Sequence, residues 1–157
     1  MGALSLAQRR TLAASLVPPY GRIDLLCDGD WVSIITYRHR MMSYRVAVFV
    51  DGGFVGKWCN PQEPCRQQRY MRRMEKPVLT PADRVHFARI FGKKKVANDP
   101  KYQRKHVYFY PDFASGGAAL AHLSRVCQDI REATEEELLT LRAAALAALP
   151  TPAEETA

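Results

Sequence analysis

The chain has 157 residues, the length of one domain with room for a short appendage. Apolar residues make up 47% and charged residues 25%, an ordinary globular composition that argues against wholesale disorder. No apolar run approaches the roughly 20 residues that a membrane-spanning helix needs. The composition therefore excludes a membrane span, a collagen and a coiled-coil rod.

The start of the chain predicts a helix and not a secretory signal. Arg9 and Arg10 follow the first apolar stretch, whereas a signal peptide carries its basic residues before that stretch. Residues 4–16 have leucines near one helical stripe, and Pro18 and Pro19 end the helix because proline cannot donate a helical hydrogen bond. We therefore expect a soluble, cytoplasmic protein that does not contact a membrane.

Charge is distributed unevenly along the chain. The formal net charge is +7, but residues 38–105 hold seventeen basic and five acidic residues, a net charge of +12. Residues 129–157 carry a net charge of −5. A basic middle and an acidic end either bind an anionic partner or partly neutralise each other within the molecule.

Residues 22–59 have the pattern of an antiparallel meander. Asp28-Gly29-Asp30 and Asp51-Gly52-Gly53 are turn sequences, because Gly supplies the positive φ that tight hairpins need. The segments around them are rich in β-branched and aromatic residues. The predicted strands are residues 22–27, 31–37, 44–50 and 54–59.

Helix signals dominate the second half of the chain. Thr80, Pro81 and Asp83 mark a helix start, and Gly92 marks its end. The next segments are a loop at Lys93–Lys95, an aromatic strand at residues 105–110 and a helix at residues 116–130. Thr134 and Glu137 then form a capping-box pattern for a last helix through Leu149, followed by a frayed end at Pro150-Thr151-Pro152.

These elements predict an α+β fold. We expect an antiparallel sheet of four or five strands from residues 22–59 and 105–110, with the N-terminal helix and the C-terminal helices packed on it. Residues 1–131 would form one domain, and residues 132–157 an acidic, alanine-rich C-terminal helix and frayed tail. Trp31 and Trp58 should be partly or wholly buried, because large aromatic side chains dominate small cores.

No group of residues in the sequence indicates an enzyme, a metal site or a cofactor. The nucleophile elbow, the zinc-protease motif and the phosphate-binding loop are all absent. Asp28 and Asp30 flank a glycine and can in principle hold a divalent ion, but a turn accounts for both. Reduced thiols are favoured over a metal site or a disulfide for Cys27, Cys59, Cys65 and Cys127, which form no CxxC pair.

The basic segment is the strongest functional signal. Such clusters neutralise phosphates and release counterions, while Tyr and Arg planes stack on unpaired bases. If residues 66–76 were helical, Arg66, Arg69 and Arg73 would share one face. A solvated basic face without a ligand is the alternative. The candidate residues for binding nucleic acid or an acidic partner are Arg66, Arg69, Tyr70, Arg72, Arg73, Lys76, Lys93, Lys94, Lys95, Lys101, Arg104 and Lys105.

Four short segments suggest a family resemblance: residues 27–30 (CDGD), 46–58 (VAVFVDGGFVGKW), 90–94 (IFGKK) and 108–123 (YFYPDFASGGAALAHL). Together they resemble a family of small, mostly uncharacterised phage and prophage proteins. The similarity spans residues 27–123 and leaves out the acidic residues 132–157. It brings no catalytic residues with it, and it implies a phage protein in the cytoplasm of a host cell.

The resemblance sets the order of three hypotheses for function. Small phage proteins without enzyme motifs often act by binding, so the first is an inhibitor of bacterial defence, similar to anti-CRISPR proteins, that docks on a host nucleoprotein complex or its nucleic acid. The second is a phage regulator that binds DNA or RNA. The third is an enzyme with an unrecognised site around Asp28, Asp30 and His39.

Overall fold

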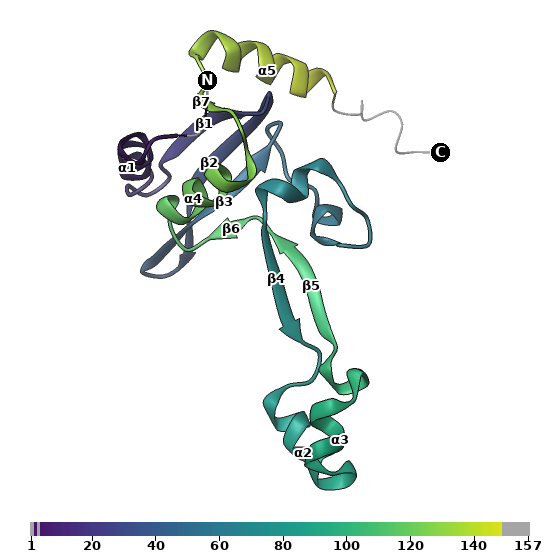
Figure 1. Ribbon diagram of the computed structural model, residues 1–157. Coiled ribbons are helices and arrows are strands. Elements are labelled where there is room, and N and C mark those ends of the chain that lie inside the picture. Colours follow the sequence, from purple (N-terminus) through teal and green to yellow (C-terminus); the bar gives the residue numbers. More distant parts are fainter. Residues whose placement is uncertain (1, 3, 149–157) are drawn as a thin grey trace.

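A five-stranded antiparallel sheet forms the centre of the structure, a computed structural model that describes residue 2 and residues 4–148 (Figure 1). The architecture confirms the predicted α+β fold. None of the described helices is long and apolar enough to cross a membrane. The strand order is β6-β3-β2-β1-β7, built from β1 (Arg22–Cys27), β2 (Asp30–Arg40), β3 (Ser43–Val50), β6 (Asp112–Phe113) and β7 (Ile130–Glu132).

Two tight Asp-Gly turns form where the sequence predicts them: the first joins β1 to β2, and the second follows β3, while β2 and β3 are joined at Met41 and Met42. In the first, φ is 50° at Asp28 and 89° at Gly29; in the second, φ is 52° at Asp51 and 77° at Gly52. Positive φ at both central residues is the turn geometry that follows the natural twist of a hairpin. Asp tolerates this region and Gly enters it without cost, which explains the repeated Asp-Gly pair.

The predicted fourth strand of the meander, residues 54–59, is wrong. The chain makes one bridge between Val50 and Gly53 and then forms a short 3-10 helix, η1 (Gly56–Cys59). The outer edge of β3 is already occupied, because β6 pairs with Val46 and Ala47 and the amide of Val48 donates to the carbonyl of Pro111. β6, which is distant in sequence, therefore pairs with the edge of β3 to which residues 54–59 would have to bind.

Two helices, α1 (Leu6–Ser15) and α4 (Gly116–Val126), cover one face of the sheet. They approach each other closely, since a Cβ at Gly116 would lie 2.6 Å from Leu16 Cδ1. The hydroxyl of Thr36 donates to the carbonyl of Leu16 at 2.7 Å and ties the end of α1 to the sheet. The core beneath these helices includes Leu12, Ile23, Leu25, Val32, Ile34, Val46, Val48, Leu120 and Leu123.

The end of the described chain differs from the prediction in one element. The helix expected over residues 116–130 ends at Val126, and Ile130 instead pairs with Cys27 in β7. The last helix, α5 (Glu135–Ala147), begins with the predicted capping box of Thr134 and Glu137. The predicted helix end at Leu149 and the frayed residues 150–152 lie outside the described residues.

Residues 72–110 form a projecting arm (Figure 1). Its stalk is a separate two-stranded ribbon of β4 and β5, and its tip holds two helices and a 3-10 turn. The prediction that residues 105–110 belong to the main sheet is therefore wrong, as is the loop at Lys93–Lys95, which is helical. The arm consists of β4 (Arg72–Pro77), α2 (Pro81–Phe91), α3 (Lys93–Asn98), η3 (Pro100–Gln103) and β5 (Lys105–Tyr110).

Both tryptophans are placed as predicted. Trp31 is 3% exposed, and its indole Nε1 donates to Asp24 Oδ1 at 2.9 Å. Trp58 is partly buried against the core and meets Phe54 edge to face, with the ring centroids 5.8 Å apart. Each therefore contributes to packing and not to an exposed stacking surface.

Candidate nucleic-acid interface

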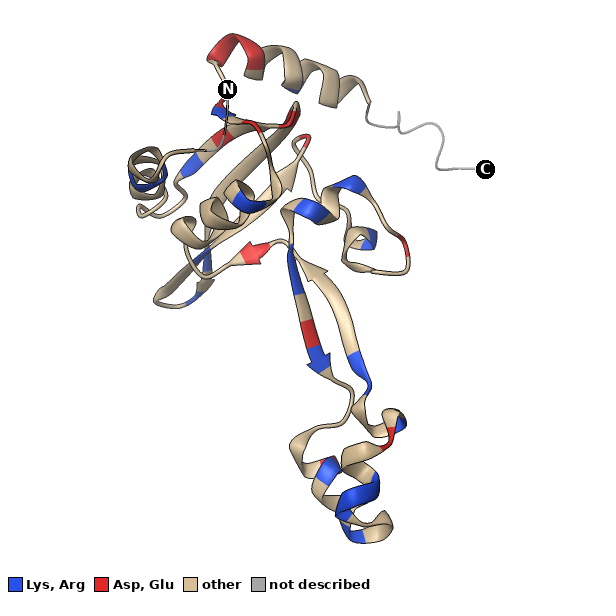
Figure 2. Cartoon of the chain, viewed as in Figure 1, with Lys and Arg blue, Asp and Glu red and all other residues tan. Residues whose placement is uncertain are grey.

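The arm concentrates the positive charge of the molecule. Its 39 residues include eleven Lys or Arg and three Asp or Glu, a net charge of +8. Figure 2 shows the basic residues along the stalk and around the tip. Much of the positive charge that the sequence spreads over residues 38–105 thus lies on the arm.

Local sequence signals build the first helix of the tip. The Thr80 hydroxyl accepts from the Asp83 amide at 3.1 Å, and the Asp83 carboxylate accepts from the Thr80 amide at 3.0 Å. The Thr80 hydroxyl also donates to Asp83 Oδ2, at 2.6 Å, and this bond together with that from the Thr80 amide holds the pKa of Asp83 below its ordinary value. Pro81 occupies the first turn, and Gly92, with φ 89°, lets the chain pass directly from α2 into α3.

A small aromatic cluster supports the cations of the tip. Tyr102 is buried, and its ring centroid lies 5.7 Å from that of Phe87 and 6.1 Å from that of Phe91. Lys95 Nζ lies 5.7 Å from the centroid of Phe91, and Lys101 Nζ lies 5.9 Å from that of Tyr102. Cation–π contacts of this kind orient the ammonium groups while leaving them accessible.

One carboxylate, Glu75, forms ion pairs with two cations of the stalk. Glu75 lies 2.6 Å from Arg73 and 3.2 Å from Lys105, and these cations lower the pKa of Glu75. Lys76 lies instead over the ring of Tyr108, with its Nζ 5.7 Å from the centroid. Among the residues that the structure describes, no carboxylate comes within ion-pair distance of eight arm cations: Lys76, Arg84, Arg89, Lys93, Lys94, Lys95, Lys101 and Arg104.

Four of the predicted binding residues make contacts with the main sheet and its turns. They lie on or beside a 3-10 helix, η2 (Arg66–Tyr70), and not on the helical face that we considered. Arg66 lies 2.6 Å from Asp30 and 2.5 Å from Asp51, so it bridges the two Asp-Gly turns. Arg69 pairs with Asp28 and donates to the carbonyl of Val126 at 2.6 Å.

Tyr70 and Arg72 complete this group. The Tyr70 ring is fully buried, and its hydroxyl donates to Asp30 Oδ2 at 2.7 Å. Burial and the neighbouring carboxylate raise the pKa of Tyr70. Arg72 Nη2 lies 3.6 Å from Asp112 Oδ1. The other eight predicted residues, Arg73, Lys76, Lys93, Lys94, Lys95, Lys101, Arg104 and Lys105, are brought together on the arm.

The residues considered for an enzyme site do not converge. Asp28 Oδ1 accepts from the amides of Gln128 and Asp129, at 2.9 and 2.8 Å, and these contacts together with Arg69 lower its pKa. Asp30 is occupied by Arg66 and Tyr70. His39 is nine positions further along the extended strand β2, roughly 30 Å away. No group of three or more His, Cys, Asp or Glu in the described part of the chain is arranged to hold a metal ion, and all four cysteines are free.

The acidic helix α5 lies at the opposite end of the molecule from the arm (Figure 1). Glu137 binds Arg131 with both carboxylate oxygens, at 2.8 and 2.5 Å. Within the residues described, no carboxylate of α5 pairs with a cation of the arm. The described contacts therefore do not include the internal neutralisation that the charge distribution allowed.

Sequence reasoning missed four arginines, of which three are exposed and Arg84 is half-buried. Arg84 and Arg89 lie on α2 at the arm tip, and Arg38 and Arg40 lie near the end of the β2–β3 hairpin. A signal was present for the second pair, because no Asp or Glu occurs between Asp30 and Asp51.

No family model, curated protein or solved structure matches the chain, so the candidate site is described from the structure alone.

Proposed function

We propose that the protein binds nucleic acid, with the arm as its main contact. The observation that carries the proposal is the set of eight arm cations without a carboxylate partner among the described residues. Lys and Arg that neutralise phosphates release condensed counterions, which supplies most of the free energy of non-specific binding. The arm should therefore bind most tightly to a ligand that presents a dense linear array of negative charge.

The shape of the arm favours a nucleic acid over a single acidic protein patch. The six-residue strands of the stalk are each about 20 Å long, and the helices of the tip extend the basic surface further. A duplex carries one negative charge for about every 1.7 Å of its axis, so it can engage cations along this whole length. The aromatic cluster keeps part of these cations in place before binding.

Fluorescence anisotropy tests the proposal with a labelled 20-base-pair DNA duplex and with single strands of DNA and RNA, each across a salt series. The double variant Lys93→Ala/Lys94→Ala should bind several-fold more weakly, with a salt slope smaller by about 1.8 on the duplex and about 1.4 on the single strands. The matched control, Arg125→Ala/Arg142→Ala, removes two exposed cations outside the arm. Equal losses in both variants would show that net charge alone matters, and absence of any binding would reject the function.

A second candidate is an inhibitor of bacterial defence that docks on a host nucleoprotein complex. The specific observation in its favour is that the arm tip also exposes apolar side chains, including Val85, Ile90 and Phe91. Exposed apolar residues beside cations suit a surface made of both protein and nucleic acid. Stable capture of such a complex from nuclease-treated host lysate, with little binding to free nucleic acid, would favour this candidate.

A further inference from the structure

We propose that a groove beside the β2–β3 hairpin binds the backbone of single-stranded nucleic acid as a second contact. This inference rests on the proposed function and extends it to the body of the molecule. Two cavities of about 410 and 370 Å³ share Tyr44, Arg45 and Ala114 in their walls, so they adjoin each other. We call the two together the hairpin groove.

The hairpin groove has the charge that a phosphodiester backbone requires. Arg10 lines one cavity, Arg40 and His39 line the other, and Arg45 lines both. None of the residues that line either cavity is acidic. In the described part of the chain, neither Arg10 nor Arg40 has a carboxylate within ion-pair distance. The groove therefore offers Arg10 from α1 and Arg40 from the hairpin as cations without a described carboxylate partner, and between them Arg45, which is paired with Asp112.

Aromatic side chains accompany these cations. Tyr44 is 42% exposed and meets the exposed ring of Tyr20 edge to face, with the centroids 6.5 Å apart. Cations that follow a backbone, beside aromatic rings on which bases stack, are the combination that binds single strands with little sequence preference. The paired bases of a duplex cannot stack on these rings, which is why we infer a single strand.

The hairpin itself is built to project. β2 and β3 extend beyond the last β1 partner, Ile35, and near their tip they pair only with each other. Arg38 Nη2 donates to the carbonyl of Met41 at 2.8 Å and closes the turn. Met41 and Met42 are 78% and 91% exposed. The projecting end of the hairpin can therefore flank a bound strand.

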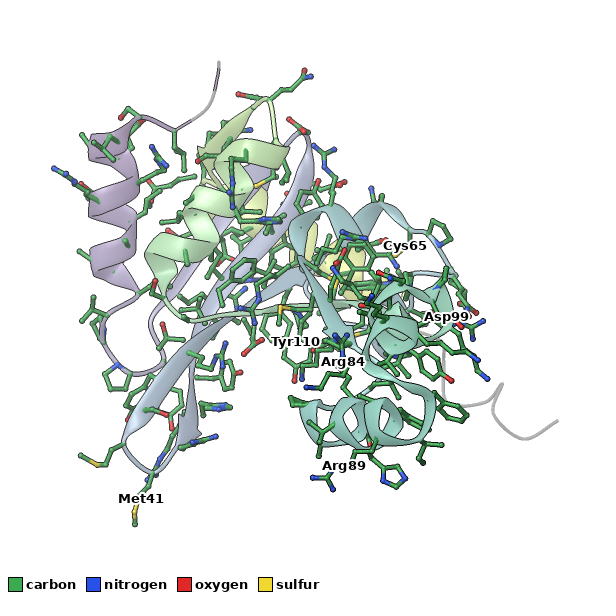
Figure 3. All side chains as sticks on the ribbon, turned by 60° about the horizontal axis from the view of Figure 1, so that its bottom comes forward. Met41, Cys65, Arg84, Arg89, Asp99 and Tyr110 are labelled. Carbon is green, nitrogen blue, oxygen red and sulfur yellow. The ribbon has the colours of Figure 1, made fainter. Side chains whose placement is uncertain are left out.

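The hairpin groove lies close to the base of the arm. Arg45 lies 2.7 Å from Asp112, and Asp112 also contacts Arg72 at the start of β4. In Figure 3 the hairpin end, marked by Met41, and the arm tip, marked by Arg84 and Arg89, both lie toward the lower part of the view. One strand can therefore pass from the arm to the groove.

The test compares labelled 30-nucleotide oligo(dT) with a 20-base-pair duplex in anisotropy titrations. Arg10→Ala/Arg40→Ala should bind the oligo(dT) about five- to tenfold more weakly, with a salt slope smaller by about 1.4. Arg10→Lys/Arg40→Lys should retain that slope, because it keeps the charge. Tyr44→Ala should weaken binding to oligo(dT) more than binding to the duplex. Arg125→Ala/Arg142→Ala is the control, and thermal melting of each variant shows whether the fold is intact.

The possible failures of this test are distinguishable. Wild-type affinity for oligo(dT) in a folded Arg10→Ala/Arg40→Ala variant, with weaker binding by Lys93→Ala/Lys94→Ala, would overturn the groove and leave the proposed function standing. Equal losses for oligo(dT) and duplex across the groove variants would overturn the assignment to a single strand. Absence of binding by the wild-type protein would overturn both the groove and the proposed function.

Discussion

Arg45 of β3 and Asp112 of β6 form an ion pair, with Nε 2.7 Å from Oδ2, at the point where the arm leaves the sheet. The Asp112 side chain is 6% exposed. Its second oxygen, Oδ1, lies 3.6 Å from Nη2 of Arg72, the first residue of β4. One carboxylate thus joins the edge of the sheet to the base of the stalk. The position of the arm depends on this cluster because an isolated two-stranded ribbon has little stability of its own.

Replacing Asp112 by Asn should destabilise the protein. The substitution keeps the size of the side chain but leaves Arg45 and Arg72 close together without a neutralising charge. Breaking a buried ion pair costs about 3–5 kcal/mol, and the partial exposure of both arginines places our expectation at about 2–3 kcal/mol. Urea unfolding at neutral pH measures this change. Wild-type stability in Asp112→Asn would show that the cluster does not hold the arm base.

The two tryptophans should differ in their contribution to stability. Trp31→Ala removes a buried ring and its hydrogen bond to Asp24, which should cost about 3–5 kcal/mol. Trp58→Ala removes a partly buried ring, so its cost should be smaller. Denaturant melts of both variants, followed by circular dichroism, provide the comparison. The reverse order of stabilities would contradict the packing described for these rings.

The sequence predicted the hairpins because their determinants are local. The Asp28-Gly29 turn joins β1 to β2 and the Asp51-Gly52 turn ends β3, so these turns and the alternating bulky residues specify β1, β2 and β3 without any distant contact. The arm has no such signature, since β4 has the sequence RRMEKP and lacks β-branched residues. Its pairing with the aromatic strand β5 joins segments about 30 positions apart, and periodicity does not reveal which partner a strand will choose.

The candidate site was predictable as a charge excess but not residue by residue. Arg66 and Arg69 look like free cations in the sequence, yet their partners Asp30, Asp51 and Asp28 lie 15 to 41 positions away. The Asp-Gly turns that follow β1 and β3 gather these carboxylates where η2 can reach them. Only the fold separates cations used in internal contacts from cations left free on the arm.

The ion pair between Arg131 and Glu137 should appear in the titration of Glu137. Hydrogen bonds from Arg131 and Thr134 lower the pKa of Glu137 from 4.5 to about 2 in the folded protein. A carboxyl group whose folded pKa is depressed contributes stability above its unfolded pKa and loses that contribution as pH falls toward the folded value. The attachment of α5 should therefore weaken between about pH 4.5 and pH 2.

Side-chain carboxyl chemical shifts in an NMR titration measure this pKa directly. In the wild-type protein the Glu137 midpoint should lie near the lower limit of the titration. In Arg131→Gln it should move up toward the ordinary value, because its largest cause is removed. A Glu137 midpoint near 4.5 in the wild-type protein would contradict the pairing that the structure describes.

The variant Tyr70→Phe distinguishes a structural role of Tyr70 from a role in binding. Its ring is fully buried and its hydroxyl donates to Asp30 at 2.7 Å, so Tyr70→Phe should cost about 1–2 kcal/mol by removing that hydrogen bond. The ring cannot stack on a base without leaving the core, and affinity for oligo(dT) or duplex should therefore stay unchanged. Urea unfolding and anisotropy on the same preparation measure both quantities. Weaker binding with unchanged stability would instead show that the Tyr70 hydroxyl contacts the ligand and is not held by Asp30.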